Sequence, residues 1–129
     1  MVSRAELLDA VAHRAPLAVV DLEFTGLNPE RDQICEIAII REEHGVCAEF
    51  STLVRPTVPM SEGARAVHGI ADAELAEAPA FAEVAEAVRA LLDGAVVVAH
   101  NVEVDLMFLF RAFEGTGKPL EPPVTFDTL

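Results

Sequence analysis

The hydrophobic pattern of the first half of the chain consists of three apolar runs separated by polar turns. The runs Leu17–Phe24, Ile34–Ile40 and Val46–Val54 each predict a β-strand. The second run is apolar at nearly every position, which is typical of a central strand. The turn Glu43-His44-Gly45 joins the second run to the third. We therefore expect these two strands to form an antiparallel hairpin.

The second half of the chain changes to helical periodicity around one further strand. Apolar residues at helical spacing predict a helix that ends near Gly94. Ala95–Ala99 is short and wholly apolar, which predicts a strand buried on both faces. Another helix should follow it at once and end at Gly115 or Gly117. A last strand is expected over Val124–Leu129.

Shorter helices are expected at two other places. Ser3-Arg-Ala-Glu6 has the pattern of a capping box and predicts a helix to about His13, and Ser61–His68 predicts another. The resulting order, β-β-β-α-β-α-β, predicts an α/β fold. Its sheet should mix antiparallel and parallel pairs, with helices at its flanks.

Composition and charge narrow the class of protein. A chain of 129 residues that is 52% hydrophobic suits a single domain with a real core. No apolar run is long enough to span a bilayer, and the N-terminal stretch lacks a secretory pattern. Cys35 and Cys47 show no metal-site spacing, which favours reduced cysteines in a cytoplasmic protein.

The net charge of −13 bears on nucleic acids as partners. It weighs against a protein whose affinity depends on neutralising many phosphates. It still permits the end of a nucleic acid to reach an acidic pocket filled with metal, because bound cations reverse the local charge.

Two carboxylates, Asp21 and Glu23, stand at the end of the first predicted strand. Residues two apart in a strand share a face and are separated by about 6.6 Å along the backbone. Two like charges about 5 Å apart repel by roughly 3 kcal/mol at an effective dielectric constant near 20. One interpretation is a solvated strand end where each acid pairs with an arginine. With only nine Lys and Arg for 22 Asp and Glu, a divalent cation between the two acids is the better hypothesis.

A third carboxylate, Asp105, falls in the first turn of the helix after Ala95–Ala99. An acid there could simply favour the helix dipole. If the first and fourth strands are parallel neighbours, however, Asp105 comes to the same sheet edge as Asp21 and Glu23. The three carboxylates could then converge on hard cations.

Several motifs together resemble those of the DEDD-type, DnaQ-like 3′–5′ exonucleases, which include epsilon-like subunits of DNA polymerase III. Asp21-x-Glu23-x-Thr25-Gly26 is similar to the family's first motif, and His100-Asn101-x-x-x-Asp105-x-x-Phe108-Leu109 to its second. Ala66-Val67-His68-Gly69-Ile70 and Phe126-Asp127-Thr128-Leu129 resemble two segments that accompany them. The resemblance implies an RNase H-like fold and a nuclease that hydrolyses phosphodiesters with two ions of Mg²⁺ or Mn²⁺ per complete site.

The resemblance also implies roles for particular residues. Asp21 would bridge both metal ions, Glu23 would hold one and help to orient the attacking water, and Asp105 would ligate the other. The backbone around Thr25-Gly26 would approach the 3′-terminal nucleotide. Two further substrate-binding residues are implied, namely Leu27 as a wedge against the terminal base and Asn101 as a support for the pocket.

The family's third motif bears on the activity expected of this chain. It supplies a fourth carboxylate and a preceding His or Tyr as general base, after the strand that Phe126-Asp127-Thr128-Leu129 resembles. The sequence ends at Leu129, so we expect the 129-residue chain alone to be inactive or weak. Asp127 should lie on a strand leading away from the site, and His68 should pin its own loop.

The interpretation at this point is one exonuclease domain over residues 1–129. Residues 1–16 would be a helical extension, and residues 17–129 the exonuclease core without its last helices. The expected substrate is the single-stranded or frayed 3′ end of DNA, in proofreading or repair, with a DNA polymerase as a possible partner and no membrane. Two alternatives stay open, a catalytically silent module that binds a partner and an exoribonuclease of the same family.

Overall fold

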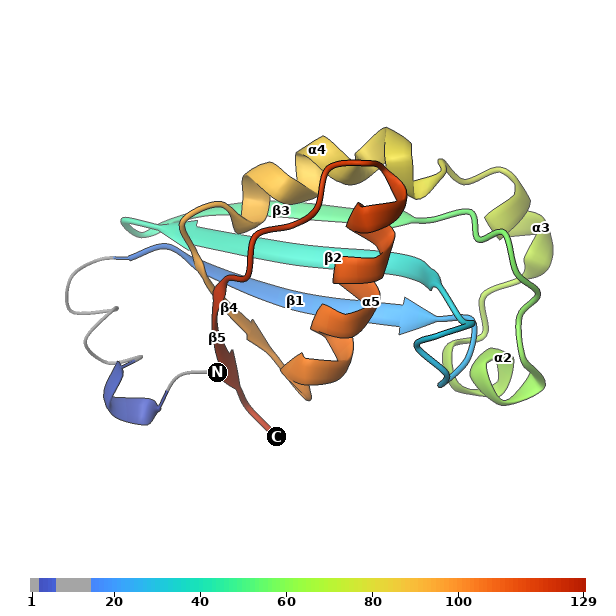
Figure 1. Cartoon of the computed structure of the whole chain (residues 1–129), viewed down its shortest axis with the longest axis horizontal. Coiled ribbons are helices and arrows are strands. Elements are labelled where there is room, and N and C mark those ends of the chain that lie inside the picture. The colour runs from blue at the N-terminus through green and yellow to red at the C-terminus, as the bar shows by residue number, and fades with distance from the viewer. Residues whose placement is uncertain (1–2, 7–14) are drawn as a thin grey trace.

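The centre of the protein is a five-stranded sheet with the order β3-β2-β1-β4-β5. The computed structural model describes residues 3–6 and 15–129. The strands are β1 (Leu17–Phe24), β2 (Ile34–Glu43), β3 (Val46–Leu53), β4 (Val96–Ala99) and β5 (Val124–Asp127). The first three are antiparallel neighbours, while β4 runs parallel to both β1 and β5 (Figure 1). The predicted mixture of antiparallel and parallel pairs is confirmed.

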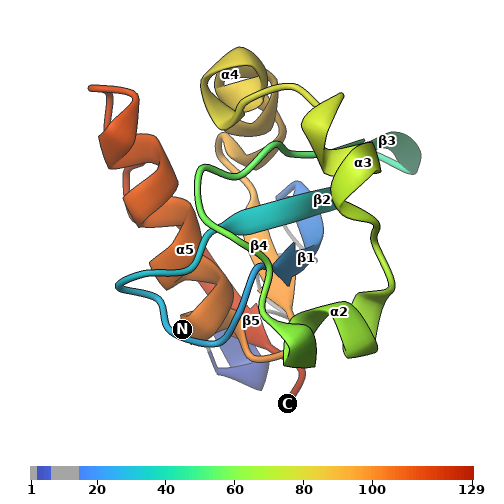
Figure 2. The same ribbon diagram turned by 90° about the vertical axis from the view of Figure 1, so that its right-hand side faces the viewer.

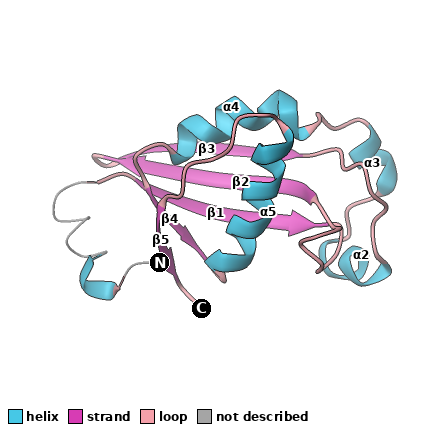
Figure 3. Cartoon of the chain, viewed as in Figure 1, coloured by secondary structure: helices cyan, strands magenta, loops and turns pink. Residues whose placement is uncertain are grey.

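Four helices accompany the sheet in residues 15–129: α2 (Glu62–His68), α3 (Asp72–Ala76), α4 (Phe81–Leu92) and α5 (Val102–Gly115). The views in Figures 1 and 2 place α4 and α5 over one face of the sheet, with α2 beyond the end of β1. Figure 3 shows how loops connect the helices to the ends of the strands. No helix in this part of the chain is both long and apolar enough to cross a membrane.

The elements predicted for residues 15–129 agree with the structure except at one place. The short helix α3 was not expected, because its only buried residue is Leu75 and so it shows no apolar periodicity. Most of the helix expected from Ser3 to His13 lies outside the described residues. Within them, the Glu6 amide donates to Ser3 Oγ at 3.1 Å, as in the predicted N-terminal cap.

The core lies between the sheet and the helices α4 and α5. Ala18, Val20 and Leu22 of β1 are buried there, alternating with residues that point the other way. The rings of Phe24 and Phe108 stack with centroids 3.9 Å apart, which fixes α5 against the end of β1. Both cysteines are free thiols, one buried in β2 and one exposed on β3.

The shortness of β4 determines what stands beside the end of β1. The pairing of β1 with β4 covers only Leu17–Val19 opposite Val96–Val98. Asp21–Phe24 therefore extends past the last paired residue of β4. The chain turns there into α5, so the first turn of this helix comes beside the end of β1 (Figure 1).

Candidate active site

The carboxylates of Asp21 and Glu23 lie on the same face of β1, opposite the core. Asp21 is exposed and Glu23 is half-buried. Burial of Glu23 and the nearby Asp21 raise the pKa of Glu23, and His68 acts in the opposite direction. Glu36 of β2 pairs directly across from Glu23 and raises this pKa further. The end of β1 therefore carries concentrated negative charge.

Asp105 in the first turn of α5 belongs to the same electrostatic cluster. The residue is only 8% exposed. Burial raises its pKa to about 7, with further contributions from Asp21, Asp127 and Glu23. The structure thus brings the three acids of the two predicted motifs into mutual electrostatic contact.

An open cleft of about 560 Å³ joins the two motifs. Asp21 and Asp105 both line it, together with Leu27 and Asn101. Glu23 is not among its lining residues. The cleft therefore contains two of the three predicted metal ligands and two of the predicted substrate-binding residues.

The described basic residues do not neutralise these acids. No ion pair in residues 3–6 and 15–129 joins Asp21, Glu23 or Asp105 to a Lys or Arg. The ion pairs lie elsewhere: Arg31 with Asp32, Arg41 with Glu43, Arg65 with Asp72, and Arg89 and Lys118 with Glu86. Within the described chain, the interpretation of a strand end capped by arginines is therefore wrong.

The chemistry of the cluster fits a divalent cation, although the side chains do not enclose one. Among the described residues, no group of three or more His, Cys, Asp or Glu is arranged to hold a metal ion. Carboxylate oxygens are the ligands that Mg²⁺ and similar hard cations prefer. A cation here would favour the ionised form of Asp105, whose pKa is raised largely by burial and by its acidic neighbours.

The loop after β1 is held from behind by the buried carboxylate of Asp32. Its Oδ1 accepts a hydrogen bond from Thr25 Oγ1 at 3.0 Å, and its Oδ2 accepts one from the Asn28 amide at 3.0 Å. Burial would raise the pKa of Asp32, but these hydrogen bonds and Arg31 outweigh it and hold the pKa below its usual value. A Cβ on Gly26 would lie 2.4 Å from Asp32 Oδ2, so this close approach requires glycine.

Thr25 itself is fully committed to protein partners. Its amide donates to the Gln33 carbonyl at 2.8 Å and its carbonyl accepts from the Ser61 amide at 2.8 Å. Its hydroxyl donates to Asp32 and accepts from the Gln33 amide. The residue is 0% exposed, so the structure leaves it no free group for substrate. Leu27, in contrast, is 94% exposed at the front of the same loop.

Asn101 and Asp127 form the junction where α5 begins. Asn101 has a left-handed backbone with φ of 70°, and its amide donates to Asp127 Oδ1 at 2.8 Å. The Val102 amide donates to Asp127 Oδ2 at 3.2 Å. Asp127 therefore caps α5 from the end of β5. The expectation that it leads away from the site is wrong, because parallel β4 and β5 end at the same edge.

The two histidines near the site have different surroundings. His68 Nδ1 accepts from the Ile70 amide at 3.1 Å, so His68 pins its own loop as expected. His100 lines the acidic cleft, and its Nδ1 lies 3.3 Å from Thr128 Oγ1.

Sequence reasoning missed two acids at this site, Asp32 and Glu36. Asp32 is an isolated acid before an apolar strand. Its sequence position does not indicate a structural role, because most such acids are simply solvated. Glu36 interrupts the apolar run of β2, and it faces the same side as Glu23 because the two are cross-strand partners. That pairing depends on the register of the hairpin.

Comparisons with known proteins identify the relatives of this chain. The family model RNase_T, described as "Exonuclease", matches residues 18–129. A "DNA polymerase III subunit epsilon-like protein" of Rhodobacter capsulatus is 42% identical over 122 residues, which are 92% of this chain and 17% of that protein. A "3'-5' exonuclease DinG" of Staphylococcus epidermidis is 34% identical over 116 residues, which are 89% of this chain and 13% of that protein. This chain thus spans less than a fifth of either relative.

A solved structure has the same fold. E. coli exonuclease I in complex with a dT13 oligonucleotide superposes with a TM-score of 0.77 at 17% identity, covering 88% of this chain and 28% of that one. The predicted RNase H-like architecture is thereby confirmed.

The raised pKa of Asp105 predicts how stability depends on pH without metal. Between its ordinary pKa of 3.8 and its folded value of about 7, the folded state binds more protons than the unfolded state. The free energy of unfolding should therefore fall as pH rises through this window and level off above it. Between about pH 5 and pH 8, the Asp105→Asn variant should therefore lose about 1–3 kcal/mol less of its free energy of unfolding than the unchanged protein does. Urea unfolding in EDTA measures this difference, with Glu103→Gln, an exposed acid of the same turn, as control. An unchanged pH dependence in Asp105→Asn would contradict the assignment.

The contact between Gly26 and Asp32 predicts coupled effects on stability. Gly26→Ala should destabilise the fold because the new methyl group overlaps the Asp32 carboxylate. Asp32→Ala should cost about 1–3 kcal/mol because it leaves buried donors without an acceptor. The double variant should be more stable than the sum of the single effects implies, by about 0.5–3 kcal/mol, since removing Asp32 makes room for the methyl group. Urea unfolding of the four proteins tests this, and strict additivity would show that the two residues do not meet.

Proposed function

Because the chain belongs to the RNase T exonuclease family, we propose that it is the core of a metal-dependent 3′–5′ exonuclease acting on the 3′ end of single-stranded or frayed DNA. One observation carries the proposal. Asp21 and Glu23 from the end of β1 and Asp105 from the start of α5 form a single electrostatic cluster, and no described Lys or Arg makes an ion pair with any of them. Such a cluster suits divalent cations that bind phosphodiesters.

Asp21, Glu23 and Asp105 are the residues that would hold the metal, either Mg²⁺ or Mn²⁺. We expect two ions, as the resemblance to the exonuclease motifs implies. When bound, such ions generate a hydroxide from water and offset the charge on the phosphate. Metal binding should release the proton that Asp105 retains at pH values below about 7.

The loop after β1 would position the terminal nucleotide. Thr25 has no free polar group and Gly26 is buried, so the contact falls to the exposed side chain of Leu27. The exposed Leu27 would pack against the terminal base. Asp32 would act as a positioning residue, because its carboxylate fixes this loop from behind. Asn101 would shape the opposite wall beside Asp105.

The relatives support DNA as the substrate. The E. coli exonuclease I of the same fold was solved with a DNA oligonucleotide. Matching proteins from Rhodobacter capsulatus and Treponema pallidum are named as DNA polymerase III epsilon-like or epsilon subunits, which supports a DNA polymerase as partner. The chain spans only part of these proteins, so substrate and partner both belong to the proposal.

Metal binding can be measured directly. Mn²⁺ should raise the melting temperature of the protein, because a ligand at 100 times its dissociation constant stabilises the folded state by about 2.7 kcal/mol. Asp21→Ala should abolish this shift. Glu49→Ala removes one exposed charge on β3 and should keep it. An equal shift in Asp21→Ala would show that the ion binds elsewhere.

Nuclease activity is tested by incubation of a 5′-labelled DNA strand with the 129-residue protein and Mn²⁺. We expect a slow ladder of products shortened from the 3′ end. It should weaken by at least about 100-fold in Asp21→Asn, because a metal ligand is lost. An RNA strand of the same sequence compares the two substrates. Normal Mn²⁺ binding without any shortening would show that the chain is inactive by itself, which both the exonuclease core and the silent module allow, and equal activity in Asp21→Asn would point to a contaminating nuclease.

A further inference from the structure

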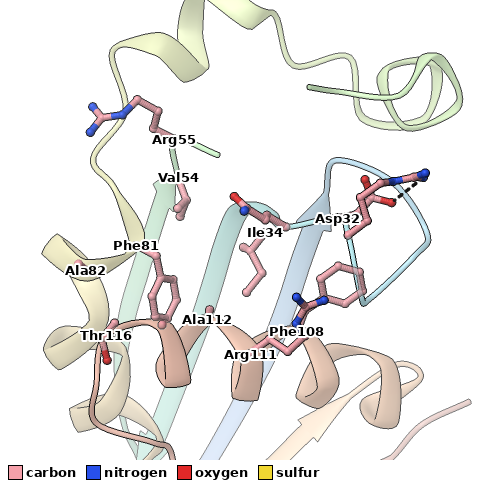
Figure 4. Close-up of a pocket in the computed structure, with 13 residues that line it drawn as sticks. Asp32, Ile34, Val54, Arg55, Phe81, Ala82, Phe108, Arg111, Ala112 and Thr116 are labelled. Atoms are coloured by element: carbon pink, nitrogen blue, oxygen red, sulfur yellow. Dashed lines mark hydrogen bonds and ion pairs between the residues drawn. The ribbon is translucent and has the colours of Figure 1, made fainter. Parts of the chain in front are cut away.

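A second cleft, of about 270 Å³, lies on the helix-covered side of the sheet (Figure 4). Its walls come from the start of β2, the chain after β3, the start of α4 and the second half of α5. Phe108 lines this cleft and Phe24 lines the acidic one, and their stacked rings separate the two. The second cleft is therefore separate from the acidic one, although Asp32, which supports the loop after β1, is among its lining residues.

The floor of the second cleft is apolar. Five residues form it: Ile34, Val54, Phe81, Phe108 and Ala112. In Figure 4 they surround a space between the sheet and α5. This space suits one bulky apolar side chain, which would gain stability by leaving water.

The rim of the cleft is basic in a protein of net charge −13. Arg31, Arg55 and Arg111 all contribute to its lining, although the sequence has only nine Lys and Arg. Figure 4 shows Arg55 at one end of the cleft, turned outward, and Arg111 beside Phe108 at the other. The single carboxylate of the lining, Asp32, is occupied by Thr25, by the Asn28 amide and by Arg31.

Two of these arginines keep their positive charge without a described acidic partner. Arg55 donates to the Ala78 carbonyl at 3.0 Å, and Arg111 donates to the Pro29 carbonyl. Neither makes an ion pair with a carboxylate of the described residues, whereas Arg41, Arg65 and Arg89 do. Backbone carbonyls fix the two guanidinium groups in place but do not cancel their charge, so both remain available to an anion.

The floor favours a peptide over a nucleic acid as the occupant. Bases bind to single-strand sites largely by stacking on exposed aromatic faces. Phe108 is only 3% exposed and already stacks on Phe24, and Phe81 packs edge-on against Phe113. The cleft thus offers a hole for an apolar side chain but no free ring on which a base could stack.

We propose that this cleft docks an acidic peptide segment of a partner protein, which inserts one bulky apolar side chain into the space between the sheet and α5 while its flanking carboxylates meet Arg55 and Arg111. The apolar anchor supplies the contact area and the arginines select for negative charge. This site is independent of the proposed nuclease activity.

Fluorescence anisotropy with a labelled peptide tests the proposal. The probe carries a central Phe between runs of Asp, and two control peptides carry Ser in place of Phe or Lys in place of Asp. We expect the probe to bind, and binding to weaken about tenfold when Phe is replaced by Ser, a loss of about 1.4 kcal/mol. The Lys peptide should not bind.

Variants of the protein place the peptide in the cleft. Ala112→Leu fills the floor and Arg55→Gln removes one rim charge, and each should weaken binding about tenfold. Arg65→Gln is the matched control, because Arg65 is exposed on α2 and pairs with Asp72. Melting temperatures verify that each variant is folded. Equal binding of the Ser or Lys peptide, or no effect of Arg55→Gln, would overturn the proposal. A dT oligonucleotide provides the alternative outcome. If it displaces the probe, and if its own binding also weakens in Arg55→Gln, the cleft is a nucleic-acid site instead.

Discussion

Repulsion among carboxylates at the end of β1 is the constraint on which the site depends. Asp21, Glu23 and Asp105 are held near one another by a strand and a helix that cannot move apart without disrupting the core, because the stacked rings of Phe24 and Phe108 fix α5 to this end of β1. No described Lys or Arg forms an ion pair with these acids, and His68 opposes the raised pKa of Glu23 only in part. The fold therefore maintains a state that is unfavourable without a cation, and the energy stored in that repulsion becomes available when a cation binds.

The geometry that creates this state follows from the length of one strand. Because β4 stops pairing at Val98, the end of β1 has a strand neighbour on one side only. The first turn of α5 comes to the other side, with its start capped by Asp127 from β5. Asp32 fixes the loop that follows β1. In both supports a carboxylate accepts hydrogen bonds from backbone amides or from a hydroxyl group. Asp32 and Asp127 therefore have hydrogen-bond donors of their own, unlike the acids of the cluster.

The sequence predicted most of the fold because the signals were local. Alternation along β1 and the apolar run of β2 gave the strand positions, and the spacing of Asp21 and Glu23 gave their common face. What was missed depends on hydrogen bonds and pairings that leave no periodic pattern in the sequence. The roles of Asp32 and Asp127 are set by hydrogen bonds to residues up to 26 positions away. The short helix α3 is fixed by a single buried leucine, which leaves no periodicity to detect.

The distribution of positive charge explains how a chain of net charge −13 can combine an acidic cleft with a basic one. Most of its described basic side chains bind carboxylates or backbone carbonyls that belong to the helices or to the β2–β3 hairpin. These contacts lie away from Asp21 and Asp105. The acidic cleft thus keeps a negative field that opposes the approach of a polyanion, and bound cations would reverse the local charge. Arg55 and Arg111 line the second cleft, and neither is among the groups that shift the pKa of Glu23 or Asp105. Separation by the aromatic pair therefore lets opposite charges persist in one small domain without cancelling.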